Sequence, residues 1–202
     1  MRMAKQVIIS INREYGSGGH EIAEKIARDL ELPLYDRNLL DEIAKENGIN
    51  AEHFEEFDEK PRRPMISRKV RGLSNSMEEH LANMQFEYLK KKGDSGESFV
   101  VVGRCSETIL REHDSLISIF VLADRGDKVS RVQKKYDLSS SEALMKMNRH
   151  DRNRRFYHNS HSSYRWGDSR GYDICVNSSR LGIDGTVKML EHYIEERKNN
   201  NA

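Results

Sequence analysis

Apolar residues gather in short runs that are separated by longer amphipathic stretches. Four runs are strongly apolar and rich in β-branched residues, at positions 7–11, 99–102, 117–122 and 172–176, and a weaker one spans 32–35. None of them alternates cleanly between apolar and polar positions, which is typical of strands buried on both faces of a parallel sheet. Because helical stretches lie between the runs, the pattern predicts repeated β–α units and an α/β doubly wound sheet.

Apolar residues at helical spacing predict the intervening helices. They indicate helices over 22–30, from residue 39 to near Gly48, over 51–57, over 67–92 and over 183–196. Another helix opens at Ser139, where Glu142 three residues later completes a capping-box pattern. No convincing strand is expected between residues 38 and 96. The long helix over 67–92 either packs on the body of the protein or pairs with a partner helix, so a homodimer is compatible with the sequence.

The length, charge and cysteine content of the chain limit which classes of protein it can belong to. The chain has 202 residues, a formal net charge of +1 and 33% charged residues, which suits one well-solvated domain. No apolar run is long enough to span a bilayer, and the N-terminal segment does not resemble a signal peptide. Cys105 and Cys175 each lie in or beside an apolar run, so we expect two buried free thiols in a reducing cytoplasm. Nothing in this balance demands a nucleic acid or a membrane as partner.

A glycine-rich turn follows the first predicted strand. Gly16, Gly18 and Gly19 separate that strand from a helix, and this context favours a phosphate-binding loop. Glycine lets backbone amides approach an anion closely, and the helix N-terminus adds the positive end of its dipole. A standard loop reads G-x-x-x-x-G-K-[ST], but here Gly19 and His20 stand where the lysine and the hydroxyl residue are expected. A tight turn without a ligand is the alternative.

Charged residues follow the strands at the edge where ligands of such sheets bind. The segments in question are residues 13–20, Asp36 with Arg37, Gly103 with Arg104, and Asp124 with Arg125. Their arginines favour an anionic ligand. For Asp36, capping of the next helix competes with contact to a substrate, and for Arg104 the alternative is a structural ion pair.

An arginine cluster ends the helix that opens at Ser139. Residues 149–155 hold four arginines in seven positions, and Arg152 and Arg155 lie three apart on one helical face. A solvated helix face is one interpretation of such a run, and a patch that binds anions or RNA is the other. The near-neutral net charge counts against RNA.

Taken in order, these features resemble the cytidylate kinases, and more closely the cytidylate kinase-like family whose members begin with an S-R-E-Y-G-S-G-G type loop. The resemblance covers residues 7 to about 190. It implies a single P-loop NTPase-like domain over 1–202, with three α/β/α layers and a five-stranded parallel sheet. It also implies a helical monophosphate-binding insertion at about 38–96 and a lid region at about 139–170.

The resemblance also implies roles for individual residues. The expected phosphate- and nucleotide-binding residues are Gly16, Ser17, Gly18, Gly19, His20 and Glu21, with Asn177 near the adenine. The expected acceptor-binding residues are Asp36, Arg37 and Arg104. The expected catalytic residues are Arg13 and three arginines of the lid, Arg149, Arg152 and Arg155. Mg²⁺ is expected to enter with ATP, and no residue is assigned as its ligand.

Several positions depart from the cytidylate kinase pattern. Besides the two loop positions, Val102 and Cys105 stand where that family has carboxylates around Gly-Arg. Phosphoryl transfer depends mainly on positioning and positive charge, so another cation can replace the loop lysine. Arg13 is the candidate and Arg37 the next. His20, a poor Mg²⁺ ligand, either binds phosphate when protonated or caps the helix.

Two functions follow from these observations. The first is an enzyme that transfers the γ-phosphoryl group of ATP to CMP, dCMP or a related acceptor by direct in-line attack, beneath a lid that excludes water. The second is a nucleotide-binding regulatory or sensor protein of the same fold, without kinase activity, in which the missing lysine and hydroxyl are not needed. Turnover with Mg·ATP separates the two.

Overall fold

A five-stranded, all-parallel sheet forms the centre of the protein. The computed structural model describes residues 5–36, 38–47, 69–70, 73–74 and 77–200. The strands are β1 (Ile8–Arg13), β2 (Leu34–Tyr35), β5 (Phe99–Val102), β6 (Leu116–Leu122) and β7 (Ile174–Asn177), in the order β2-β5-β1-β6-β7. All five predicted strands are confirmed, with small shifts at their ends.

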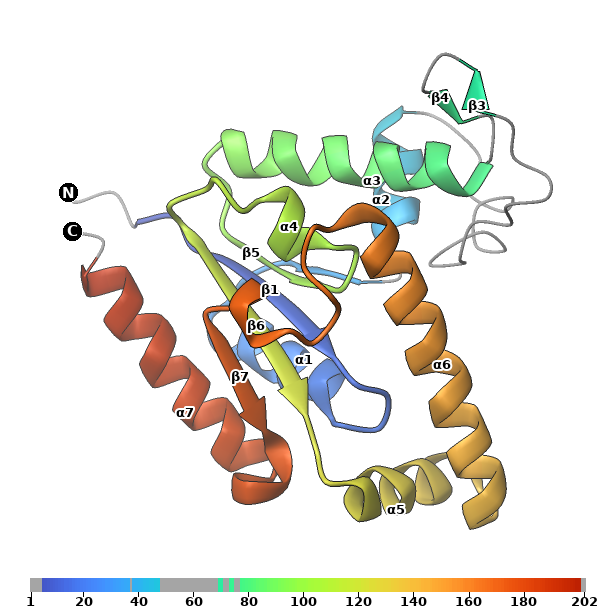
Figure 1. Ribbon diagram of the computed structural model, residues 1–202. Coiled ribbons are helices and arrows are strands. Elements are labelled where there is room, and N and C mark those ends of the chain that lie inside the picture. The colour runs from blue at the N-terminus through green and yellow to red at the C-terminus, as the bar shows by residue number, and fades with distance from the viewer. Residues whose placement is uncertain (1–4, 37, 48–68, 71–72, 75–76, 201–202) are drawn as a thin grey trace.

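Helices cover both faces of the sheet (Figure 1). They are α1 (Gly19–Asp29), α2 (Leu39–Asn47), α3 (Met77–Asp94), α4 (Ser106–Ile109), α5 (Arg125–Tyr136), α6 (Ser140–His161) and α7 (Ser178–Asn200). Ile9 and Val100 belong to a core cluster that α1 and α7 complete, whereas their neighbours Ile8 and Phe99 belong to a second cluster with α2 and α3. Successive strand residues therefore point into two apolar cores, which explains why the strands lack alternation. The predicted three-layer α/β/α fold is confirmed.

The strand order creates a crevice at the carboxyl end of β1. β1 pairs with β5 on one side and with β6 on the other, with Ile11 opposite Val102 and Arg13 opposite Val121. The connection that leaves β1 leads to β2 beyond β5, whereas β6 and β7 lie on the opposite side of β1. Ligands of open α/β sheets bind where the strand order reverses in this way. The glycine-rich turn after Arg13 lies at this position.

The region before α3 differs from the prediction of one long helix over 67–92. Two short strands, β3 (Lys69–Val70) and β4 (Leu73–Ser74), pair antiparallel there, and α3 begins only at Met77. The expectation of no strand between residues 38 and 96 was therefore wrong. The sequence holds β-branched Val70 and Gly72 in this stretch, and both residue types have low helix propensity. The short helix predicted over 51–57 lies outside the described residues.

Two further differences occur near the C-terminus. α7 begins at Ser178, before the predicted start at 183, and contains one non-helical residue, Gly182, at φ 67°. Cys175 is exposed, contrary to the prediction, because β7 is the edge strand of the sheet, whereas Cys105 is buried as expected. Among the described helices, none combines the length and hydropathy that crossing a membrane requires.

A Schellman motif ends α1. The amide of Leu32 donates to the Ala27 carbonyl at 2.8 Å and the amide of Glu31 donates to the Arg28 carbonyl at 3.1 Å. This geometry puts Glu31 in the left-handed region, at φ 54°, although its side chain is exposed. Glycine adopts this conformation without the steric cost that a Cβ brings.

We expect Glu31→Gly to raise the free energy of unfolding by about 0.5–1 kcal/mol, because the substitution relieves the left-handed conformation. Urea unfolding of the variant measures this difference. Glu31→Ala is the control, since it removes the same side chain and keeps the Cβ. Equal stability of the two variants would contradict the explanation.

Candidate functional site

The loop between β1 and α1 adopts a conformation that needs glycine. Gly16 and Gly18 have φ values of 82° and 81°, in the left-handed region. A Cβ at Gly16 would also lie 3.0 Å from the Lys128 carbonyl oxygen, and one at Gly18 would overlap Ile183. The loop therefore turns tightly against α5 and α7, and this leads its backbone directly into the N-terminus of α1.

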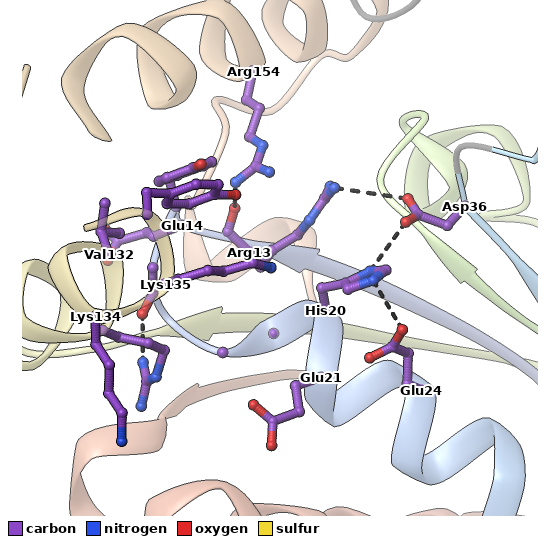
Figure 2. Close-up of a pocket in the computed structure, with 16 residues that line it drawn as sticks. Arg13, Glu14, His20, Glu21, Glu24, Asp36, Val132, Lys134, Lys135 and Arg154 are labelled. Carbon is purple, nitrogen blue, oxygen red and sulfur yellow. Dashed lines mark hydrogen bonds and ion pairs between the residues drawn. The ribbon is translucent and has the colours of Figure 1, made fainter. Parts of the chain in front are cut away.

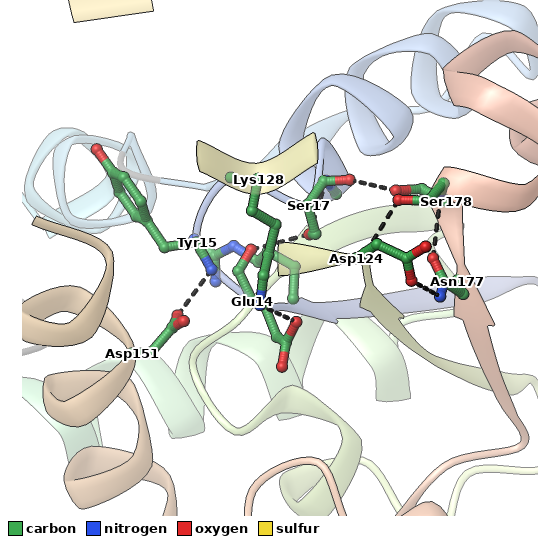
Figure 3. A network of polar contacts seen from close by, with 12 residues as sticks. Glu14, Tyr15, Ser17, Asp124, Lys128, Asp151, Asn177 and Ser178 are labelled. Atoms are coloured by element: carbon green, nitrogen blue, oxygen red, sulfur yellow. Dashed lines mark hydrogen bonds and ion pairs between the residues drawn. The ribbon is translucent and has the colours of Figure 1, made fainter. Parts of the chain in front are cut away.

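Side chains of the loop itself, of α7 and of α5 hold the loop carbonyls, and the two serines among them are labelled in Figure 3. Ser17 Oγ donates to the Glu14 carbonyl at 2.8 Å, Ser178 Oγ donates to the Ser17 carbonyl at 2.6 Å, and Arg131 donates to the Gly16 carbonyl. Because C=O and N–H of one peptide unit point in opposite directions, the contact with Ser178 turns the following amide, that of Gly18, away from α7. The loop conformation is thus fixed by the protein itself.

A cavity of about 880 Å³ opens above this loop. Its cationic lining residues are Arg13, Arg131, Lys134, Lys135 and Arg154. Its acidic lining residues are Glu14, Glu21, Glu24 and Asp36. The loop glycines form one wall, and Tyr15, Val132 and Tyr136 add less polar surface. Cations beside loop amides and a helix N-terminus make this cavity suitable for a phosphorylated ligand.

Arg13 packs directly against Gly19. A Cβ at Gly19 would lie 2.5 Å from Cβ of Arg13 and 3.2 Å from Cβ of Val121. No side chain fits at position 19 while Arg13 holds this place. Arg13 is itself almost fully buried, and it brings a guanidinium to the cavity from the residue before the loop.

Asp36 joins the charged groups on this side of the site (Figure 2). Its carboxylate lies 4.0 Å from Arg13 Nη2 and 3.0 Å from His20 Nδ1, while Arg104 donates to its main-chain carbonyl at 3.2 Å. Burial opposes ionisation of Asp36, but the hydrogen bond from His20 and the charges of Arg13, His20 and Arg104 outweigh it and lower its pKa to about 2. His20 Nε2 lies 3.1 Å from Glu24, which extends the row of contacts.

The donors around the loop do not suit a protein-held Mg²⁺. Mg²⁺ prefers carboxylate, hydroxyl and water oxygens, yet the Asp36 carboxylate faces the Arg13 guanidinium and the His20 imidazole, and Ser17 Oγ is used within the loop. Asp124 accepts hydrogen bonds from Asn177 and Arg180. Within the described parts of the chain no group of three or more His, Cys, Asp or Glu side chains could hold a metal ion. We therefore assign no residue as a metal ligand.

The structure brings most of the predicted phosphate-binding residues to the cavity. The predicted residues that line it are Arg13, Gly16, Gly18, Gly19, His20, Glu21 and Asp36. Ser17 lies buried beneath the loop, and the Asn177 side chain donates to Asp124 at 2.8 Å. Arg104 is 2% exposed and contacts the main chain of Asp36. It is not one of the residues that line the cavity. Arg37 lies outside the described residues.

These contacts bear on two structural alternatives from the sequence, a capping role for His20 and one for Asp36. The N-cap of α1 is Gly18, without a side-chain hydrogen bond, so His20 does not cap that helix. The Asp36 carboxylate contacts Arg13 and His20, so its side chain is engaged toward the loop and not toward α2.

The predicted lid arginines lie away from the cavity. Arg149, Arg152 and Arg155 are all exposed on α6, and Arg155 lies over the Trp166 ring. Their neighbour Arg154 lines the cavity instead. Buried Met147 and Tyr157 mark the inner face of α6, and Arg154 lies between them at helical spacing. This spacing was the signal that could have identified Arg154.

The sequence analysis also missed the contribution of α5. Arg131, Lys134 and Lys135 line the cavity, although no helix was assigned between residues 122 and 139. Their spacing of three to four residues, after a predicted strand, was the available signal.

Comparison with known proteins agrees with this architecture. Two curated cytidylate kinases match nearly the whole chain. The protein from Pyrococcus horikoshii is 26% identical over 94% of this chain and 89% of its own length, and that from Pyrobaculum aerophilum is 27% identical over 93% and 92%. A solved structure of an uncharacterized protein from Eubacterium ventriosum is 35% identical, with a TM-score of 0.75, over 94% of this chain and 99% of that one.

More distant structures share the fold alone. Shikimate kinase from Bacteroides thetaiotaomicron superposes with a TM-score of 0.53 at 13% identity, over 94% of this chain and 98% of that one. The family model described as the cytidylate kinase-like family matches residues 8–180. That match spans the sheet, the glycine loop, α5 and α6, and the chain therefore belongs to the cytidylate kinase-like family.

Proposed function

We propose that this protein is an ATP-dependent phosphotransferase that moves the γ-phosphoryl group of ATP to CMP, dCMP or a related nucleoside monophosphate. Membership of the cytidylate kinase-like family and two curated cytidylate kinase relatives support a kinase of this class. The observation that carries the proposal is the packing of Arg13 against Gly19. This arrangement supplies a cation beside the loop position from which the lysine is missing.

In this proposal the chain contributes position and charge. The loop amides and the N-terminus of α1 hold the donor phosphates. Arg13 stabilises the negative charge of the transferring group, and Arg131 and Arg154 add charge from α5 and α6. A phosphate oxygen of the acceptor attacks in line, so the reaction needs neither a covalent intermediate nor a strong general base. Mg²⁺ enters as Mg·ATP, held by the nucleotide's own phosphates.

A nucleotide-binding regulatory protein is the second candidate. It is favoured by the carboxylates of Asp36 and Glu24, which already face Arg13 and His20, because the Asp36 carboxylate offsets part of the charge of Arg13. Such a protein would bind ATP in the same cavity without turnover.

Other expectations from the sequence stay predictions. They concern contact of Asp36, Arg37 and Arg104 with the acceptor, contact of Asn177 with adenine, a homodimer, a cytoplasmic location and closure of a lid over residues 139–170.

An assay of ADP release tests the main proposal. With Mg·ATP and a panel of CMP, dCMP, UMP, AMP and GMP, we expect turnover that depends on one pyrimidine monophosphate. Arg13→Ala should lower kcat by about 100-fold or more, because it removes a preorganised charge at the transferring phosphoryl group. The exposed Arg28→Ala is the matched control. ATP binding without turnover for any acceptor would instead select the regulatory protein, and full activity of Arg13→Ala would remove the role of Arg13.

A second comparison concerns the arginines of α6. Arg154→Ala should lower kcat/KM by about 10-fold or more, because Arg154 reaches the cavity. The double variant Arg152→Ala, Arg155→Ala should lose less, because both side chains are exposed on the other face. The opposite ranking, measured in the same assay, would mean that the outer arginines reach the substrate in the working enzyme.

The low pKa of Asp36 gives a stability prediction. Because the folded-state pKa lies below the usual value of 3.8, the ionised form stabilises the fold above pH 4, and this contribution disappears as the pH falls toward 2. Asp36→Asn should therefore cost about 2 kcal/mol at pH 6 and progressively less below pH 4. Urea unfolding at several pH values measures this, with exposed Glu195→Gln as the control. A deficit that does not depend on pH would be inconsistent with the ion pairs described above.

A further inference from the structure

One turn of α6 holds the phosphate loop through Tyr15. The main-chain amide of Tyr15 donates to Oδ1 of Asp151 at 2.7 Å (Figure 3). The Tyr15 ring stacks on the His150 ring, with centroids 4.3 Å apart and planes 6° from parallel. The Arg154 guanidinium lies 5.5 Å from the centroid of the Tyr15 ring and donates to the Arg13 carbonyl at 3.2 Å. Three neighbouring residues of α6 therefore contact the first half of the loop.

Asp151 contacts the loop without being part of the cavity lining. Tyr15 and Arg154 line the cavity, whereas Asp151 does not. The Asp151 side chain is only 16% exposed. Asp151 is therefore not a carboxylate that occupies the place of a ligand phosphate. It is a largely buried acceptor for one loop amide, outside the lining of the cavity.

The surroundings of Asp151 act on its ionisation in opposite directions, with a net rise of its pKa. Burial raises the pKa of Asp151, and the Tyr15 amide and the charge of Arg154, 3.8 Å away, act in the opposite direction. The negative charge of Glu14 on the loop also raises the pKa of Asp151, and the positive charge of Lys128 on α5 lowers it. An ionised carboxylate forms a shorter and stronger bond with an amide than a neutral acceptor does.

α6 is anchored on both sides of Asp151. Before it, Ala143 and Met147 pack with Val132 of α5. After it, His158 Nε2 lies 2.7 Å from Glu107 Oε1, and both side chains are buried. Asp151 therefore extends from a helix that packs on α5 before this residue and pairs with α4 after it.

We propose that Asp151 is a positioning residue for phosphate binding, through which the position of α6 sets the geometry of the loop. This inference rests on the proposed function of the loop as a phosphate site. It makes α6 part of the phosphate site. Displacement of this helix would weaken binding of the donor through the loop, without the need for an α6 side chain to touch the donor.

Calorimetry with inorganic tripolyphosphate tests this role, because the probe contacts the loop without a base or sugar. At pH 7 we expect Asp151→Ala to raise Kd about tenfold, since the Tyr15 amide loses its buried acceptor. Asp151→Asn keeps an acceptor oxygen and should raise Kd only about threefold. Asn148→Ala, exposed on the same helix, is the matched control and should leave Kd unchanged.

Four outcomes separate the possibilities. If the wild-type protein binds neither tripolyphosphate nor ATP, the proposed function itself fails. If it binds and Asp151→Ala binds equally well, only the role of Asp151 is wrong. Tighter binding by Asp151→Ala would also overturn the inference, because Asp151 would then oppose the ligand. If Asp151→Ala does not fold, the Asp151→Asn comparison decides: the ratio of its Kd to the wild-type Kd should fall toward one between pH 7 and pH 4, and a constant ratio overturns the proposal.

Discussion

A single buried carboxylate holds the cationic side of the site together. Asp36 follows β2, yet it meets Arg13 from β1, His20 from α1 and Arg104 from the turn after β5. This is possible because parallel strands bring their carboxyl ends to one edge of the sheet. A charge in this position is tolerated only when it is paired, so Asp36 and its partners fix one another. The guanidinium of Arg13 is consequently in place before a ligand arrives, which is the condition for electrostatic catalysis without reorganisation.

The helix α6 shows what charge density does and does not predict. The run of arginines in residues 149–155 was visible in the sequence, but the density of charge carries no information about which side chains turn inward. The inward side is set by Met147 and Tyr157, whose burial places Asp151 and Arg154 toward the loop. Arg152 and Arg155 share a face, as expected from their spacing, and that face is the exposed one.

Most of the fold could be predicted, because it depends on local patterns. The apolar runs gave the five strands, and the capping box at Ser139 and Glu142 is present with both of its hydrogen bonds. The glycines at 16 and 18 predicted a loop that only glycine can form. The features that the sequence did not predict depend on contacts between residues far apart in the chain. The exposure of Cys175 follows from the place of β7 at the edge of the sheet, and the partners of Asp36 follow from the order of β2, β5 and β1.

The packing of Arg13 on Gly19 limits which side chains the loop can accept. A lysine at position 19 has no room in this backbone, because its Cβ would meet the Cβ at position 13, which every residue except glycine carries. Replacing Arg13 alone, on the other hand, leaves the loop without its nearest cation. Loss of the arginine alone therefore removes charge without making room for a lysine. A lysine at position 19 also requires either a glycine at position 13 or a shift between β1 and α1.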